Sequence, residues 1–356
     1  MKRLRTAIIG QGRSGRDIHG RFFKSENNTL VEVVYVVELD AERRARALEE
    51  YPGCSALSDY TQLFDKKDID LVVNATYSND HYAITKDLLS HGLNVLVEKP
   101  FARNYYECGD LIKTAKDADV TLAVFHQSLL APHHLGIKKI IDGGKLGNIK
   151  QIDIRYNSLH RRWDWQTLQM NMGGSVYNTG PHPIGMALDY LDFDDNAQVV
   201  YSKLDTALTS GDAEDYAKIL ITAPGKPLVD IEISAVDPYC DYTVKLQGDK
   251  GTCVCTFNKY KMTYIVDGEN PERPVIIESL KNDAGLPAYC GEQLIKHTEE
   301  GDFTGSSFDV AVKDFYTMLY GSIVDNIPME ISPEKVAQII NVIEKVHADN
   351  PLPVKF

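Results

Sequence analysis

The sequence predicts an α/β protein with two domains: a parallel sheet covered by helices on both faces, then a larger, open and mainly antiparallel sheet. The length of 356 residues exceeds what one core usually fills, at roughly 150 residues per domain. In the first third, short apolar runs alternate with helical stretches, whereas later strand-like runs follow one another directly. We therefore expect a first domain over residues 1–124 and a second over residues 125–356.

Short runs rich in β-branched residues predict the strands of the first sheet, at residues 6–9, 30–37, 70–73, 93–97 and 120–125. Helices are expected from the first glycine-rich turn to about Phe23, over residues 40–50 with Asp40 as N-cap, and over residues 81–91. Continuous apolar strands that alternate with helices indicate a parallel sheet buried on both faces.

The second domain is expected to begin with a helix over residues 128–143 and a half-exposed strand over residues 150–156. Further strand candidates follow without helices between them, at residues 198–202, 216–222, 228–236, 242–247, 252–257 and 262–266. This succession indicates a mainly antiparallel sheet. Two helices close the chain, over residues 308–326 and 333–348, and Pro333 suits the first turn of the second one.

The composition argues against several classes of protein. The chain has 38 basic and 51 acidic residues, a net charge of −13, which disfavours binding to nucleic acid or to anionic membranes. Six scattered cysteines suggest free thiols, and the close pair Cys253 and Cys255 has no further metal ligands nearby in sequence. No apolar run approaches the ~18 residues of a membrane span. We expect a cytoplasmic protein with no metal site, no signal peptide and no membrane partner.

A glycine-rich turn opens the first helix directly after the first strand, in the segment Gly10-Gln11-Gly12-Arg13-Ser14-Gly15. Glycines let the backbone approach a pyrophosphate at the helix N-terminus, so these residues are candidates for binding a dinucleotide. Glu38 ends the second strand, where a carboxylate accepts from both ribose hydroxyls and repels a 2′-phosphate. This favours NAD, while Arg43 and Arg44 leave NADP open. A dinucleotide fold that binds no cofactor is the alternative.

The segment Glu98-Lys99-Pro100 follows another predicted strand of this sheet. Ligands of open parallel sheets bind outside the carboxyl ends of the strands, and Pro100 stops the strand, so Lys99 should project at that edge. A lysine beside a cationic nicotinamide has its charged form disfavoured and is a plausible donor or sharer of a proton. The alternative is an ordinary surface lysine.

Two glycine turns bracket the segment from Gly173 to His182. It carries Asn178 and His182 four residues apart, a spacing that would let them share one helical face. Imidazole is the side-chain base best suited to take a hydroxyl proton near neutral pH. The alternative is a histidine that caps a helix or lies in the core.

Together these segments resemble the Gfo/Idh/MocA family, the glucose-fructose oxidoreductase and inositol dehydrogenase group. The resemblance covers nearly the whole chain and rests on the glycine turn, Glu38, residues 76–81, Glu98-Lys99-Pro100, Gly147 and the segment ending at His182. Within the family, residues 161–165 most resemble the sugar-acting branch typified by scyllo-inositol dehydrogenase.

The resemblance implies a Rossmann domain and a C-terminal α/β domain whose open sheet often forms the oligomer interface, hence a homodimer or homotetramer. It also implies hydride transfer between a ring carbinol carbon and nicotinamide. By position, Lys99 would lie against the reacting oxygen, His182 would exchange its proton, and Asn178 would orient the substrate where many members carry aspartate. Cofactor contacts carried over in the same way come from Thr76, Asn79, His81, Glu98, Lys99 and Gln127.

The chain departs from the family pattern near the expected nicotinamide. Tyr77 replaces a proline, and Gln127 stands in a segment that lacks the usual Asn/Arg pair. An amide at Asn178 cannot act as a base, although it can hold a hydroxyl. We expect the substrate preference to have drifted while the enzyme class is retained.

A tryptophan-rich stretch supplies the candidate substrate contacts, which are Arg161, Arg162, Trp163 and Trp165. Indole rings present a large apolar face to the C–H face of a sugar, and guanidinium forks bind hydroxyls or carboxylates. The alternative is a loop that covers the crevice or forms an oligomer contact.

Three functions are compatible with these residues. The first is an NAD(P)-dependent oxidoreductase acting on a sugar, glycoside or cyclitol. The second retains NAD and is redox-neutral: it oxidises a ring hydroxyl transiently, eliminates a glycosidic substituent and returns the hydride. The third is a non-catalytic, nucleotide-responsive regulator, which would have no need for both Lys99 and His182.

Overall fold

The computed structural model describes residues 2–305 and 307–356 and contains two sheets. The first sheet is parallel, as expected, with the strand order β3-β2-β1-β4-β5-β6. Its strands are β1 (Leu4–Ile9), β2 (Val31–Val37), β3 (Ser55–Leu57), β4 (Leu71–Asn74), β5 (Val95–Val97) and β6 (Leu122–Val124). The strand β3 has no counterpart among the strands that the sequence predicts.

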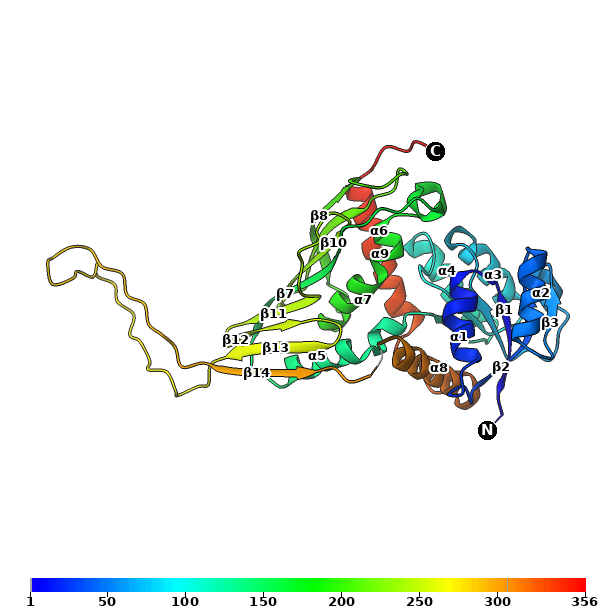
Figure 1. Ribbon diagram of the computed structural model, residues 1–356, viewed down its shortest axis with the longest axis horizontal. Helices are drawn as coiled ribbons and strands as arrows, with labels where there is room; N and C mark the ends of the chain where they lie inside the picture. Colours follow the sequence, from blue (N-terminus) through cyan, green and yellow to red (C-terminus); the bar gives the residue numbers. More distant parts are fainter. Residues whose placement is uncertain (1, 306) are drawn as a thin grey trace.

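Helices cover this sheet (Figure 1). They are the π-helix η1 (Arg13–His19), α1 (Gly20–Phe23), α2 (Ala41–Glu50), α3 (His81–Ser90) and α4 (Tyr105–Asp117), with the short 3-10 turns η2 (Tyr60–Leu63) and η3 (Ser78–Asp80). The helix expected after the glycine turn thus begins as η1 and continues as α1. Asp40 caps α2 as predicted, because its side chain accepts from the Arg43 N–H at 2.8 Å.

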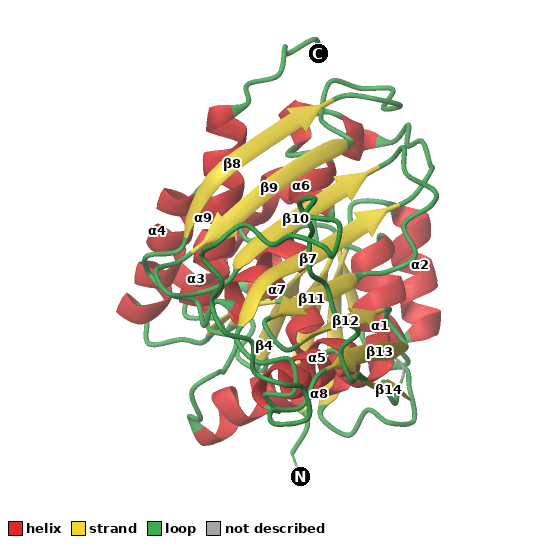
Figure 2. Cartoon of the chain, turned by 90° about the vertical axis from the view of Figure 1, so that its left-hand side faces the viewer, coloured by secondary structure: helices red, strands yellow, loops and turns green. Residues whose placement is uncertain are grey.

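The second sheet has the order β14-β13-β12-β11-β7-β10-β9-β8. All neighbours are antiparallel except β7 and β10, which confirms a mainly antiparallel sheet. Figure 2 shows this sheet facing the viewer, with α5 and α7 behind it. Its strands are β7 (Ile149–Asn157), β8 (Gln198–Asp205), β9 (Tyr216–Thr222), β10 (Leu228–Ser234), β11 (Val244–Gly248), β12 (Gly251–Cys255), β13 (Lys259–Tyr264) and β14 (His297–Asp302).

The face of this sheet toward the first domain carries the apolar side chains and is covered by helices. Between β6 and β8 the chain forms the 3-10 turn η4 (Gln127–Leu130), α5 (Pro132–Asp142), the 3-10 turns η5 (Trp165–Thr167) and η6 (Gln169–Asn171), α6 (Ser175–Asn178) and α7 (Pro181–Tyr190). Of these, α7 contacts β7 and β10, and α6 contacts β9. The last four elements lie between β7 and β8, and they place the segment that carries Asn178 and His182 against the first domain.

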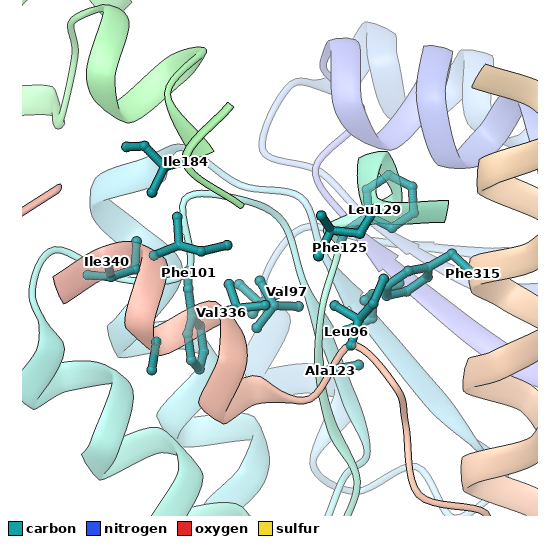
Figure 3. Packing of buried hydrophobic residues seen from close by; sticks show 14 of the residues in the cluster. Leu96, Val97, Phe101, Ala123, Phe125, Leu129, Ile184, Phe315, Val336 and Ile340 are labelled. Atoms are coloured by element: carbon teal, nitrogen blue, oxygen red, sulfur yellow. The ribbon is translucent and has the colours of Figure 1, made fainter. Parts of the chain in front are cut away.

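The two C-terminal helices, α8 (Ser307–Asp325) and α9 (Pro333–Asp349), return to the first sheet. α8 contacts α1 and η4, and α9 contacts α4 and β6. In Figure 3, Phe315 of α8 lies beside Phe125, and Val336 of α9 lies beside Phe101. All four side chains are buried, and the rings of Phe125 and Phe315 are 5.0 Å apart. One continuous hydrophobic core therefore joins the two sheets.

A long arm, residues 267–296, projects from the end of β13 and β14 (Figure 1). The strand expected at residues 262–266 is β13, which begins three residues and ends two residues earlier, and the sequence does not predict β14 at all. The base of the arm is held by hydrogen bonds of 2.7 and 3.3 Å between Asn270 and Ile295.

No helix within residues 2–305 and 307–356 combines the length and hydropathy needed to cross a membrane. In the same residues, no three His, Cys, Asp or Glu side chains are grouped so as to hold a metal ion.

The tight packing of the glycine turn predicts a specific loss of stability. An alanine Cβ at Gly15 would lie 2.0 Å from the carbonyl oxygen of Gly10, whereas at Gly109 of α4 it would meet nothing within 4 Å. We expect Gly15→Ala to lower the free energy of unfolding by about 1–3 kcal/mol through overpacking. Gly109→Ala, the control, should raise it by about 0.5–1 kcal/mol through helix propensity. Urea titrations of both variants check this, and equal effects would contradict it.

Candidate active site

The glycine turn connects β1 to η1 and leaves one side open. The Gly10 N–H donates to the Val37 carbonyl at 2.8 Å, which ties the turn to the end of β2. A Cβ added at Gly12 would have no heavy atom within 4 Å. The backbone at Gly12 can therefore be approached closely by a bulky ligand, and the turn fits the pyrophosphate of a dinucleotide.

Glu38 lies just after β2, with only 9% of its surface exposed. Its carboxylate accepts from the Gln11 N–H at 2.8 Å and from the Asp40 N–H at 3.0 Å. Arg44 donates to the backbone carbonyls of Glu38 and Leu39. A fixed negative charge thus stands beside the turn, where it would disfavour a 2′-phosphate.

A buried chain of polar side chains stands behind Lys99. The Glu98 carboxylate accepts from the Lys99 N–H at 3.0 Å, and its other oxygen lies 3.1 Å from Nε2 of His19. Nδ1 of His19 lies 2.7 Å from the hydroxyl of Tyr316 in α8. Nδ1 of His19 is thus paired with the Tyr316 hydroxyl, while its Nε2 faces the Glu98 carboxylate. Burial opposes ionisation of Glu98, but His19 and the charge of Lys99 outweigh it and lower its pKa.

Lys99 reaches from the first domain to the second. Its Nζ donates to the backbone carbonyl of Asn178, the last residue of α6, at 2.9 Å. Burial lowers the pKa of Lys99, the Glu98 carboxylate opposes this effect, and the charges of Arg13 and Arg162 lower the pKa further. An ammonium group is thus held at the interface of the two domains in surroundings that ease the loss of its proton.

His182 lies near Lys99 in the first turn of α7. Its Nδ1 is 3.0 Å from the hydroxyl of Ser128. Burial lowers the pKa of His182 well below its ordinary value, and Lys99, His126 and His133 lower it further. The imidazole is therefore neutral at neutral pH and free to accept a proton.

Asn178 and His182 do not share a helical face, so that expectation was wrong. Asn178 ends α6 and His182 belongs to α7, because the chain turns at Gly180. The side-chain oxygen of Asn178 accepts from the Gln166 amide at 3.1 Å. Its backbone and its side chain thus both take part in fixed contacts around Lys99.

A buried glutamate anchors the start of α6. Gly174 has a φ of +101°, and a Cβ there would lie 2.3 Å from the Glu214 carboxylate. Glu214 accepts from the Val176 N–H at 2.8 Å and lies 3.4 Å from Nε2 of His347 in α9. Burial disfavours the imidazolium of His347, but Glu214 outweighs it and raises the pKa of His347.

The other predicted cofactor residues occupy different depths. Thr76 donates to the side chain of Asn74 at 2.7 Å, and Asn79 is exposed. His81 is buried and its Nδ1 lies 2.7 Å from the Pro100 carbonyl, so this contact holds the backbone directly after Lys99. The side-chain oxygen of Gln127 is buried with no hydrogen-bond partner among the described residues, which makes it available to a ligand.

Several residues of the site were missed by the sequence analysis. His126 is fully buried, its ring centre lies 5.8 Å from that of His182, and neither ring nitrogen has a hydrogen-bond partner in the described chain. Burial lowers its pKa to about 3. The sequence could have indicated that His126 belongs to the site, because the residue lies just after β6 and so at the same edge of the sheet as Lys99. The contacts of His19 with Tyr316 had none, since 297 residues separate them.

Of the predicted substrate residues, Arg162 lines a small cavity together with Asn178, and the two tryptophans differ in their surroundings. Trp163 is 79% exposed, whereas Trp165 packs edge-to-face on Tyr77 of the first domain, with ring centres 4.9 Å apart. Arg162 is bound to Asp164 and to the side chain of Gln166. The structure therefore brings Trp165 and the unusual Tyr77 together across the two domains.

Two sequence models match the chain. Residues 4–126 match the one described as "Oxidoreductase family, NAD-binding Rossmann fold", and residues 134–254 match the one described as "GFO/IDH/MocA C-terminal domain". The chain belongs to the Gfo/Idh/MocA family. This confirms the family resemblance drawn from the motifs and makes the chain a member of an oxidoreductase family with an NAD-binding Rossmann fold.

Curated relatives are about a quarter identical to this Gfo/Idh/MocA member over the residues that align. The oxidoreductase C115.03 of Schizosaccharomyces pombe is 26% identical over 263 residues, 71% of this chain and 70% of the relative. The scyllo-inositol 2-dehydrogenase (NADP(+)) IolW of Bacillus subtilis is 25% identical over 187 residues, 52% of this chain and 51% of the relative. The 2,7-anhydro-N-acetylneuraminate hydratase of Mediterraneibacter gnavus is 26% identical over 185 residues, 50% and 47%. The last two alignments span about half of each relative's length.

Solved structures share the whole fold. An oxidoreductase of Bacillus subtilis, YvaA, has a TM-score of 0.79 at 18% identity, with 98% of this chain and 95% of that chain covered. KijD10, a 3-ketoreductase of Actinomadura kijaniata in complex with NADP and TDP-benzene, has a TM-score of 0.77 at 16% identity and covers 98% of both chains.

The chain of hydrogen bonds behind Lys99 predicts the effect of removing one hydroxyl. Tyr316→Phe leaves Nδ1 of His19 buried without a partner, so we expect the free energy of unfolding to fall by about 1–3 kcal/mol. Tyr320→Phe is the matched control on the same helix, where the lost hydroxyl binds the Lys2 carbonyl at a part-exposed site. Its cost should be smaller in the same urea titration. Equal losses in the two variants would contradict the arrangement.

Proposed function

We propose that this protein transfers hydride between a nicotinamide cofactor and a ring hydroxyl carbon of a sugar, glycoside or cyclitol. The observation that carries the proposal is the meeting of Lys99 with Asn178: Nζ is fixed at 2.9 Å from a carbonyl of the other domain, close to His182. Two groups able to exchange protons thus converge beside the carboxyl ends of the first sheet, where ligands of such folds bind.

The proposed roles follow from the ionisation of these groups. A bound nicotinamide supplies the hydride acceptor or donor. The neutral imidazole of His182 takes the hydroxyl proton on oxidation and returns it on reduction. For this, the imidazole proton must be on Nδ1, donated to Ser128, so that Nε2 is free to accept. The Lys99 ammonium stabilises the negative charge that develops on the substrate oxygen.

The fixed neighbours make these roles compatible. A proton taken by His182 creates a second cation beside Lys99, and the lowered pKa values of both groups favour passing one proton onward. Asn178 orients a substrate hydroxyl without exchanging protons itself. Gly12 and its turn, together with Glu38 and Gln127, would hold the cofactor, and Glu38 favours NAD over NADP.

Replacing the two proton-handling groups tests these roles directly. Lys99→Met and His182→Ala should each lower turnover by about 10²-fold or more. Binding of NADH, followed by its fluorescence, should change far less, because both variants leave the glycine turn and Glu38 intact. Turnover close to that of the parent protein in both variants would refute the assigned roles.

The pH dependence of kcat/KM provides a separate check. His182 must be neutral to act as base and its pKa lies well below 6.5, so activity should persist as the pH falls through 6.5 and decline only at lower pH. Lys99 must be protonated and its pKa is lowered from 10.5, so the alkaline decline should begin below pH 10.5. A decline centred at pH 6.5, or one absent from the alkaline side, would contradict the roles.

A second candidate is the redox-neutral enzyme that retains its cofactor. One relative, 26% identical over about half of this chain, carries the name hydratase, a reaction without net oxidation, and this supports the second candidate. Cofactor recovered with the purified protein, cleavage of a glycoside and no net reduction of added NAD would distinguish it from a dehydrogenase.

The same proposal includes a division of the chain into two domains near residue 125. It also includes assembly into a homodimer or homotetramer and a cytoplasmic location. Contact of Arg161, Arg162, Trp163 and Trp165 with substrate is also part of it. The exposed indole of Trp163 supports that contact.

A further inference from the structure

A cavity of about 490 Å³ lies in the second domain, next to the end of α6. Thr179, which lies between Asn178 and the turn to His182, lines this cavity. Tyr156 and His160 line it as well, and with Thr179 they also line a smaller cavity of about 70 Å³ that reaches Asn178. The smaller cavity is thus bordered both by residues of the larger one and by Asn178, whose backbone carbonyl accepts from Lys99.

The charges around this cavity do not suit an anionic ligand. Among the described residues that line it, Arg155 is the permanent cation, and it is already paired with Asp230 at 2.9 Å and Asp153 at 3.5 Å. Nδ1 of His160 is occupied by the Ser158 hydroxyl at 2.7 Å. Asp241 is exposed and adds negative charge. A phosphate or carboxylate would find no uncommitted guanidinium or ammonium here.

The remaining lining suits a neutral ring with hydroxyl groups. Tyr156 and Phe257 stand edge-to-face, 5.9 Å apart, and Phe257 is 42% exposed. They offer an apolar wall to the C–H face of a ring. Thr179, Nε2 of His160 and the Asp241 carboxylate offer donors and acceptors to its hydroxyl edge.

We propose that this cavity binds a second, uncharged sugar ring, so that the substrate is a neutral glycoside rather than a free cyclitol or a sugar bearing a phosphate or carboxylate. The inference rests on the proposed function, which places the reacting ring beside Lys99 and His182. A single-ring substrate at that place would leave the cavity to water. A volume near 500 Å³ is in the range in which proteins hold small organic ligands.

Calorimetric titration of the protein with NADH present tests the inference. The probes are neutral disaccharides (cellobiose, maltose, trehalose), single rings (glucose, scyllo-inositol) and anionic sugars (a nucleoside diphosphate sugar, a sialoside). We expect at least one neutral disaccharide to bind about tenfold or more tightly than any single ring or anionic sugar. Comparable binding of a single ring, preference for an anionic sugar, or no binding of any disaccharide would overturn the inference.

Two variants locate the second ring. His160→Ala and Asp241→Asn should each weaken disaccharide binding about five- to tenfold, the loss expected for one hydrogen bond. Binding of single rings should stay within about twofold. Asp283→Asn, at an exposed position of the arm, is the control and should leave the affinities for disaccharides and for single rings unchanged. Equal weakening of one-ring and two-ring ligands by His160→Ala would place the second ring elsewhere.

Turnover measured in parallel separates this inference from the proposed function. Disaccharide binding that is weakened by His160→Ala, without nicotinamide reduction or glycoside cleavage, would leave the cavity assigned and refute the function. Oxidation of a single ring by a protein that neither binds nor oxidises disaccharides would support the function and refute the second-ring site.

Discussion

The hydrogen bond from Nζ of Lys99 to the carbonyl of Asn178 is the contact on which the site depends. It joins the turn after β5 to the end of α6, and so joins two domains that build their sheets independently. A charged donor on a carbonyl acceptor in a buried place gives a strong and directional bond. The rest of the structure holds its two ends: Glu98 and His81 fix the lysine turn, and Glu214 fixes the start of α6.

The electrostatic balance of this place is unusual for a protein interior. Lys99 has Arg13 and Arg162 near enough to lower its pKa, and Glu98 is the carboxylate that opposes them. Two further imidazoles, those of His126 and His182, stay neutral because burial and Lys99 disfavour their charged forms. Such a site is short of negative charge, and an oxyanion forming in it gains more than it would in water.

The sequence was sufficient for the parts of the fold that are governed by local patterns. The glycine turn, the cap at Asp40 and the buried strands each depend on residues close in the chain, and Lys99 follows the predicted strand β5, which ends at Val97. The strand β14 could not be predicted, because its segment His297–Asp302 is polar throughout and gains its place only from pairing with β13. The His19 and Tyr316 contact and the separation of Asn178 from His182 likewise arise from tertiary packing and from the turn at Gly180.

The return of α8 and α9 to the first sheet has a consequence for synthesis of the chain. Strand β6 and helix α4 emerge from the ribosome more than 200 residues before α9, which covers them. Until then, Phe101 and Phe125 lack the side chains of Val336 and Phe315 that shield them in the finished protein. The cofactor domain is thus the first part of the chain to be made and among the last to be completed. A nascent chain must keep this apolar surface from aggregating throughout the translation of the second domain.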